Sequence, residues 1–304
     1  MKTIIKIENL NKKFKDIIAV QNLSFSVKEG ELFAFLGING AGKSTTINIM
    51  CGEISKDSGN VVINDYNLDD EINLIKKEIG VVFQSSFLDA PLSVYDNLES
   101  RAALYGITGT EFKNRLNELS TLLDFKNLLK RPLAKLSGGQ RRRIDVARAL
   151  FHKPKILILD EPTTGLDPQT RKKIWKVIND LRKNENMTVF LTTHYMEEAS
   201  ESDYVVIIDC GKIVAEGTPL ELKNKYTRDC INIYGVNENQ IRKMGVNYNK
   251  INNGYKIFVP NTKKATELII NYPEIFVDYE ITKGKMDDVF LNITGKNLEG
   301  GSEK

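Results

Sequence analysis

The chain has 304 residues, and its 43 Lys and Arg against 40 Asp and Glu give a formal net charge of +3. Such a small excess does not supply the basic surface that a protein needs to hold nucleic-acid phosphates, so it argues against nucleic acid as the main partner. Hydrophobic residues at 41% and charged residues at 27% are typical of a folded globular protein and exclude a disordered chain. The length predicts about two domains.

The uninterrupted apolar runs, such as 156–159 and 205–208, are far shorter than the roughly 18 residues that cross a bilayer, so we expect no membrane span. Charges interrupt the apolar residues at the N-terminus, and we therefore expect no signal peptide and a cytoplasmic chain. The cysteines are widely spaced and form no CxxC pair, which favours reduced thiols over disulfides or a zinc site. They are Cys51, Cys210 and Cys230.

Residues 1–226 alternate short β-rich runs with helical patterns, which predicts an α/β domain with a largely parallel sheet covered by helices. Several of the runs are apolar throughout, as strands buried on both faces are. The expected strands are 4–7, 24–27, 32–36, 61–63, 81–83, 156–159, 188–191, 205–208 and 213–215.

A helical subdomain at about residues 85–135 is expected to interrupt this domain. Ser93 and Asp96 have the spacing of a capping box at a helix start. A second amphipathic run, from Phe112 to Leu123, follows a glycine-containing turn. No strand pattern lies between these features.

After residue 226 the pattern changes, which predicts a small separate α+β domain at 227–295. One arrangement that fits is a two-layer ferredoxin-like sandwich. The tail, 296–304, is rich in Gly, Lys and Glu and is expected to be disordered. The expected strands of the small domain are 231–234, 255–259 and 275–281, and its expected helices are 240–244, 263–271 and 287–293.

The segment 37–44, Gly-Ile-Asn-Gly-Ala-Gly-Lys-Ser, matches the pattern G-x-x-x-x-G-K-[ST] between an expected strand and an expected helix. Its glycines let backbone N–H groups converge on phosphate oxygens at a helix N-terminus. Lys43 would add a positive charge near the β and γ phosphates, and the Ser44 hydroxyl could ligate Mg²⁺. The predicted nucleotide-binding residues here are Gly37, Ile38, Asn39, Gly40, Ala41, Gly42, Lys43, Ser44 and Thr45.

Two carboxylates, Asp160 and Glu161, follow the apolar strand 156–159, at the end of a strand where ligands bind in open α/β sheets. In-line phosphoryl transfer needs a metal to spread charge and a positioned nucleophile. We therefore expect Asp160 to hold the water shell of the metal, and Glu161 to orient or deprotonate the attacking water.

A second helix start with exposed N–H groups is predicted at Ser137-Gly138-Gly139-Gln140, so one chain would have two phosphate-binding helix starts. The run 141–143, Arg-Arg-Arg, follows directly. Beside this helix start we interpret it as a solvated or interface face and not as a nucleic-acid site. The single tryptophan, Trp175, is interpreted as packing.

The segment 136–140, Leu-Ser-Gly-Gly-Gln, resembles the signature of the ATP-binding cassette (ABC) superfamily. The resemblance extends over residues 1–226. It implies that Phe14 stacks on adenine, that Gln84 contacts Mg²⁺ and water, that Asp167 lies in a loop that crosses a dimer and that His194 reaches the γ-phosphate. It also implies that two copies pair head to tail, with ATP and Mg²⁺ between the phosphate loop of one copy and the signature of the other.

Residues 82–106 are similar to the drug-exporter branch of bacterial type-two ABC exporters, with Ser93 and Asp96 in place of Thr and Glu. The segments 192–198 and 287–295 resemble the same branch, whereas Lys285 departs from its usual capping Ser or Thr. The resemblance implies an ATP-hydrolysing subunit at the inner face of the membrane. It would power a separately encoded permease that exports drugs, peptides, lipids or ions.

Two other functions stay open. The chain could serve an importer or a regulatory or self-immunity complex, although its C-terminal domain is short beside the regulatory domains of some sugar importers. A soluble ABC ATPase acting on DNA or ribosomes is disfavoured. The stretch from Lys43 to Ser137 is too short for the coiled-coil arm of chromosome-type members, and ribosome-acting members usually have two cassettes.

Overall fold

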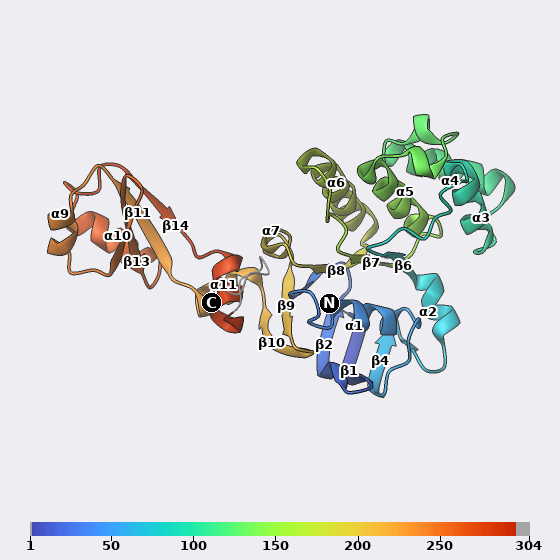
Figure 1. Cartoon of the computed structure of the whole chain (residues 1–304), viewed down its shortest axis with the longest axis horizontal. Helices are drawn as coiled ribbons and strands as arrows, with labels where there is room; N and C mark the ends of the chain where they lie inside the picture. The colour runs from blue at the N-terminus through green and yellow to red at the C-terminus, as the bar shows by residue number, and fades with distance from the viewer. Residues whose placement is uncertain (1, 296–304) are drawn as a thin grey trace. The chain divides into compact units, whose positions relative to one another are not determined.

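A computed structural model describes residues 2–295 (Figure 1). Contacts within it divide the chain into two units, Met1–Ile213 and Val214–Lys304. The division lies earlier than the expected boundary after residue 226, because helix α8 (Pro219–Tyr226) packs on α11 (Met286–Thr294) within the second unit. The tail at 296–304, expected to be disordered, lies outside the described residues.

The first unit supplies five strands of a six-stranded sheet with the order β10-β9-β3-β8-β7-β6, whose edge strand β10 crosses the division after Ile213. β3 pairs in parallel with β8 and β9, and β7 pairs in parallel with β6 and β8. Every residue of β3, β7 and β8 is buried, in agreement with their apolar sequences. The strands are β3 (Leu32–Leu36), β6 (Ile79–Val82), β7 (Ile156–Asp160), β8 (Thr188–Thr193), β9 (Tyr204–Asp209) and β10 (Lys212–Gly217).

A separate antiparallel sheet, with the order β2-β1-β4-β5, contains the strands expected at 4–7 and 24–27, which are much longer than predicted. Register shifts interrupt the β1–β2 pairing, so the alternation that marks a strand is lost in the second half of β1 and in the first half of β2, which pairs with it. Phe25 stacks on Phe33 of β3 with ring centroids 5.4 Å apart, which joins the two sheets in one core. The elements here are β1 (Thr3–Phe14), β2 (Ile17–Lys28), α1 (Lys43–Met50), β4 (Ser58–Ile63), β5 (Tyr66–Asn67) and α2 (Ile72–Glu78).

Helices α3, α4 and α5 pack on one another, and α5 also packs on β6 (Figure 1). The predicted helix start at Ser93 is present, since its Oγ accepts a hydrogen bond from the backbone N–H of Asp96 at 3.1 Å. The helices of the first unit after α2 are α3 (Val94–Ala103), α4 (Gly109–Leu122), α5 (Gly138–Leu150), α6 (Pro168–Glu185) and α7 (Met196–Ser200).

The second unit contains an antiparallel sheet with the order β12-β13-β11-β14, and its chain order is β11-α9-β12-β13-α10-β14. The strand expected at 275–281 is wrong in its first half, because Ile275 and Phe276 are buried in a turn whose N–H groups bond to the carbonyl of Tyr272. The further elements are β11 (Asp229–Tyr234), α9 (Glu238–Lys243), β12 (Tyr248–Ile251), β13 (Gly254–Val259), α10 (Thr262–Asn271) and β14 (Tyr279–Thr282).

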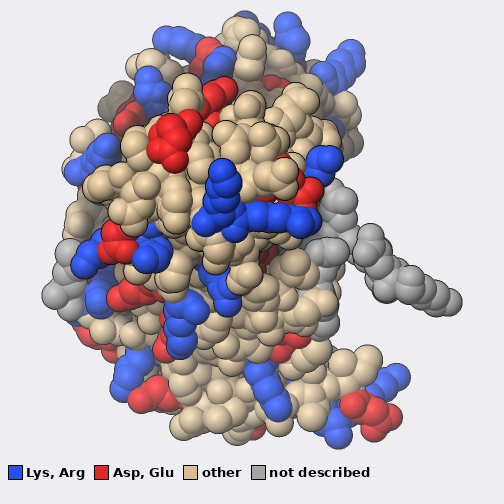
Figure 2. All heavy atoms as spheres, turned by 90° about the vertical axis from the view of Figure 1, so that its left-hand side faces the viewer, with Lys and Arg blue, Asp and Glu red and all other residues tan. Residues whose placement is uncertain are grey.

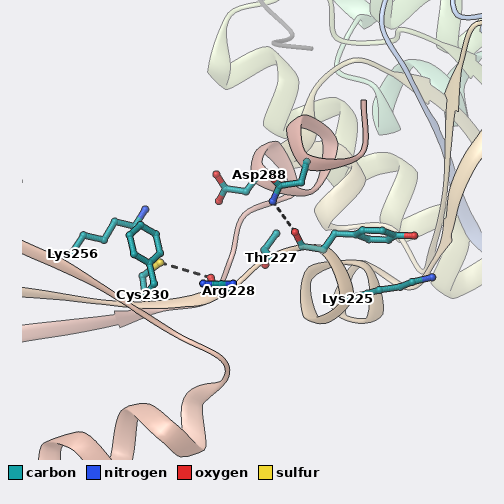
Figure 3. A pocket seen from close by; sticks show the side chains of 9 residues that line it. Lys225, Thr227, Arg228, Cys230, Lys256 and Asp288 are labelled. Atoms are coloured by element: carbon teal, nitrogen blue, oxygen red, sulfur yellow. Dashed lines mark hydrogen bonds between the residues drawn. The ribbon is translucent and has the colours of Figure 1, made fainter. Parts of the chain in front are cut away.

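Beside α11 the second unit has an open cavity of about 380 Å³. Asn292 of α11 donates a hydrogen bond to the carbonyl of Tyr226 at 2.8 Å. Asp288, labelled at the cavity in Figure 3, accepts one from the N–H of Lys285 at 3.2 Å. The departure at Lys285 is therefore compensated by a carboxylate in the first turn. The cavity is lined by Lys225, Tyr226, Thr227, Arg228, Cys230, Lys256, Phe258, Asp288 and Asn292.

On the face drawn in Figure 2, Lys and Arg side chains are interspersed with Asp and Glu. That face has no uniform positive field of the kind that attracts a polyanion. Within residues 2–295, every helix is too short or too polar to span a bilayer.

Candidate nucleotide site

The phosphate loop (residues 37–44) leads from β3 into α1, and two of its glycines, Gly37 and Gly42, are required by close backbone contacts. Gly42 is the N-cap of α1 and has φ 110°, in the left-handed region that favours glycine. A Cβ atom there would lie 2.5 Å from the carbonyl oxygen of Ala19, and one at Gly37 would lie 2.6 Å from that of Ile208. The strand, loop and helix predicted from the motif are therefore all present.

The other residues of the predicted loop differ in exposure. Asn39, Gly40 and Ser44 are exposed, so that the Ser44 hydroxyl is accessible at the first turn of α1. Ile38 and Thr45 are half-buried and Ala41 is buried.

Lys43 folds back over the loop and is only 5% exposed. Its Nζ donates hydrogen bonds to the carbonyls of Gly37 at 2.7 Å and Ile38 at 3.2 Å, and lies 3.4 Å from Glu161 Oε1. Burial lowers the pKa of Lys43, while the neighbouring Glu161 carboxylate acts in the opposite direction. The ammonium group is thus held between the loop and the carboxylate.

The Glu161 carboxylate is where four distant parts of the chain meet. Gln84 Nε2 donates to its Oε2 at 3.3 Å, and His194 Nδ1 lies 3.3 Å from its Oε1, on the side of Lys43. Glu161 itself is 8% exposed and has φ 46°, which is uncommon for a residue with a side chain. The structure therefore brings Lys43, Gln84, Glu161 and His194 together.

Asp160, the last residue of β7, is buried next to Thr192 of β8. The Thr192 hydroxyl donates to Asp160 Oδ1 at 2.5 Å and accepts from the N–H of Glu161 at 3.2 Å. Thr192 was not predicted as a site residue. The feature that identifies Thr192 is strand register, because Thr192 of β8 pairs with Asp160 of the adjacent strand β7.

The signature segment (137–140) forms the start of α5. Ser137 is the N-cap and shares a capping box with Gln140, with N–H to side-chain distances of 3.2 and 3.0 Å. Ser137 and Gly138 are exposed, and a Cβ at Gly139 would lie 2.8 Å from Thr170. This helix start is separate from the described contacts around Glu161.

Two predicted site residues, Phe14 and Asp167, make no described contact with Glu161. Phe14, the last residue of β1, is exposed, with the Lys12 ammonium 5.2 Å from its ring centroid. Asp167 is the N-cap of α6, where its carboxylate accepts from the Thr170 hydroxyl at 2.6 Å and from two backbone N–H groups at 3.0 Å. These bonds, that of the Thr170 hydroxyl first, hold the pKa of Asp167 below its usual value.

The interpretation of 141–143 as a solvated or interface face is wrong for Arg142, which is 7% exposed. Arg142 donates hydrogen bonds to the carbonyls of Phe83, Asp160, Glu161 and Pro162. Successive residues on a helix point about 100° apart, so a run of one residue type does not define a single face. Burial lowers the pKa of Arg142, with nearby carboxylates opposing.

A buried carboxylate of α7, Glu198, supports the segment around His194. It accepts hydrogen bonds from the hydroxyls of Thr163 and Thr193, the latter at 2.6 Å, and from the Trp175 indole at 3.2 Å. Trp175 packs against the core, as predicted, and also makes this polar contact. Glu198 was not predicted as a site residue.

The comparisons with known proteins agree with these observations. A family model described as ABC transporter matches residues 20–164. Linearmycin resistance ATP-binding protein LnrL of Bacillus subtilis (strain 168) is 34% identical over 310 residues, which cover 97% of this chain and 99% of the relative. The chain belongs to the ABC transporter family.

Other relatives of this ABC protein support the exporter branch. Nod factor export ATP-binding protein I of Cupriavidus metallidurans is 34% identical over 305 residues, 98% of this chain and 99% of that protein. A dimeric ATP-binding cassette in a post-hydrolysis state, bound to ADP and phosphate, matches with a TM-score of 0.66 and 29% identity, over 71% of this chain and 98% of that one. The predicted ABC nucleotide-binding fold is confirmed, and the chain is an ATP-hydrolysing subunit of the exporter type.

Proposed function

We propose that Glu161 is the catalytic carboxylate of this ABC ATPase and orients or deprotonates the attacking water. The observation that supports this role most directly is the position of its carboxylate, 3.3 to 3.4 Å from Lys43, Gln84 and His194. Lys43 and the phosphate loop would hold the phosphates, and His194 would contact the γ-phosphate. A positioned base beside bound phosphates is what in-line transfer to water requires.

We propose that Mg²⁺ binds between Ser44, Asp160 and Gln84. Their hydroxyl, carboxylate and amide oxygens are the donors that this hard cation prefers, so the residues present fit the ion. When bound, Mg²⁺ would spread the charge of the transferred phosphoryl group.

We predict that phosphate release from ATP by the purified chain requires this ion. Removal of Mg²⁺ with a chelator should abolish the reaction, and added Mg²⁺ should restore it. Phosphate release is followed with a colorimetric assay. Hydrolysis that continues at an unchanged rate in excess chelator would contradict the assignment of the metal site.

We propose that two copies pair head to tail, with the nucleotide between the phosphate loop of one copy and the signature segment of the other. Support comes from two helix starts on separate elements, α1 and α5, with Ser44 and Ser137 both exposed. Phe14 would stack on adenine, and Asp167 would lie in the loop between the copies.

We propose that the first unit docks through its helical part, residues 85–135, on a separately encoded permease at the inner face of the membrane. Large apolar side chains are exposed there, with Leu104 at 75%. The others are Phe87, Leu92, Tyr105 and Leu122. Relatives named for linearmycin resistance and for Nod factor export support export, with cargo chosen by the permease from drugs, peptides, lipids or ions.

We predict that a tagged chain co-purifies with an integral membrane protein from detergent-solubilised membranes of its native host. Leu104→Glu should reduce the recovered membrane protein by on the order of tenfold without changing ATP affinity, because it places a charge in the apolar contact. A chain recovered without any membrane partner would contradict the docking proposal.

We propose that the second unit is an accessory domain of the ferredoxin-like class. Its chain order β-α-β-β-α-β and its strand order β12-β13-β11-β14 support this class. Residues 1–226 would then form the nucleotide-binding domain, and residues 227–295 the accessory domain.

A further inference from the structure

The contact between Gln84 and Glu161 is made by two residues that lie just beyond the ends of neighbouring strands. β6 ends at Val82 and β7 at Asp160, and the two strands are paired in parallel with Val82 opposite Leu159. The pairing of β6 with β7 therefore ends before the two residues whose side chains meet at 3.3 Å. Contacts from other elements must hold their backbones in place.

The buried guanidinium of Arg142, on α5, donates hydrogen bonds to backbone carbonyls in both segments, next to Gln84 and around Glu161. Its Nη1 donates to the carbonyl of Phe83, the residue before Gln84, at 2.5 Å. Its Nη2 donates to the carbonyls of Asp160 and Glu161, each at 3.1 Å. Its Nε donates to the carbonyl of Pro162 at 2.7 Å.

These contacts act on a strained peptide. Glu161 has φ 46°, a conformation that persists only when its surroundings hold it. Its N–H donates to the carbonyl of Thr192 at 3.1 Å, and its carbonyl accepts from Arg142 at 3.1 Å. The backbone of Glu161 is therefore held on both sides, by β8 and by α5.

Two further side chains on the same face of α5 extend the link to the segment around Gln84. Asp145 accepts a hydrogen bond from the Ser86 hydroxyl at 2.7 Å, and Arg148 donates to the carbonyl of Val81. Residues three apart on a helix lie on one face, so Arg142, Asp145 and Arg148 form one row along α5.

We propose that Arg142 is a positioning residue that sets the Glu161 carboxylate against Gln84 by fixing both backbones from the signature helix. The proposal rests on the proposed catalytic role of Glu161. Since α5 also begins with the signature segment, the helix that meets the nucleotide of a second copy would fix the reacting groups of its own chain.

The geometry specifies arginine and not merely a positive charge. The planar guanidinium presents several donors in a fixed fork, and here it reaches four carbonyls. A lysine ammonium at the end of a flexible chain cannot span the same set. Arg142→Lys should therefore restore only part of what Arg142→Gln removes.

Steady-state ATP hydrolysis and nucleotide affinity of the full-length chain provide the test. We expect Arg142→Gln to lower kcat by on the order of 100-fold, as misplacement of a reacting group does, with KM and ATP affinity within about twofold of the parent. Arg142→Lys should give an intermediate kcat. The matched control is Arg143→Gln, because Arg143 bonds to the carbonyls of Leu123 and Asp124, away from Glu161, and kcat should stay within about threefold.

A double-mutant cycle with Glu161→Gln separates positioning from general damage. If Arg142 acts through Glu161, Arg142→Gln should cause little further loss in the Glu161→Gln chain. Two effects that multiply independently would overturn the positioning role while leaving Glu161 assigned. If Glu161→Gln alone left the rate unchanged, the proposed function would fail instead. Should Arg142→Gln not fold, a parental kcat in folded Arg142→Lys would overturn the proposal.

Discussion

Replacing Glu161 with Gln is expected to lower the rate of ATP hydrolysis by on the order of 1,000-fold while ATP binding is retained. The amide has almost the shape of the carboxylate, so the packing among Lys43, Gln84 and His194 should survive. It cannot accept the proton of the attacking water, and the base contribution is lost. Phosphate release measures the rate, and titration with a fluorescent ATP analogue measures binding.

The matched control for this variant is Glu197→Gln, in α7. The Glu197 side chain is 90% exposed, and its described ion pair, with Arg171, is 3.8 Å long. An exposed ion pair of this kind contributes little to the stability of the fold, so the rate of ATP hydrolysis should remain near that of the parent. A Glu161→Gln chain that hydrolyses ATP as fast as the parent would show that another group activates the water.

Replacing Lys43 with Ala is expected to weaken ATP binding by roughly 10- to 100-fold, the usual effect of losing a charged hydrogen bond, and to abolish turnover. In the structure the Lys43 ammonium bonds to the carbonyls of the phosphate loop beside Glu161. Its loss removes the positive charge that would meet the phosphates, and it also leaves the buried Glu161 carboxylate without its closest cation.

Isothermal titration calorimetry with ATP measures the effect on binding, and thermal unfolding shows whether the variant is folded. Lys76→Ala is the control, because Lys76 is an exposed residue of α2 whose only described ion pair, with Glu53, is 3.8 Å long. A folded Lys43→Ala chain that binds ATP with parental affinity would contradict the assignment of the phosphate loop.

The residues at the site that were predicted follow from short-range rules. The phosphate loop depends on glycines at fixed spacing, and Asp160 and Glu161 on their place at the end of an apolar strand. Both rules need only a few consecutive residues. The prediction for Arg142 was wrong because the carbonyls that accept its hydrogen bonds, such as those of Phe83 and Pro162, are far from it in the sequence. Thr192 was missed for the same reason, since only the pairing of β7 with β8 places it beside Asp160.

The fold was predictable where hydrophobic patterns are regular. β3, β7 and β8 are buried throughout and have apolar centres, and they were placed with boundaries near those observed. The patterns failed at 275–281, where a buried turn has the same apolar residues as a strand, and at β12 (Tyr248–Ile251), which has too few apolar residues to stand out.

We propose that one ATP site is completed by the phosphate loop of one copy and the signature segment of another. The most direct measurement is the molar mass of the Glu161→Gln chain by light scattering, with and without Mg²⁺ and ATP. We predict the mass of one chain without nucleotide and of two chains with ATP, and a return to one chain when Ser137→Arg blocks the signature segment. A Glu161→Gln chain that binds ATP and keeps the mass of a single chain would contradict the account.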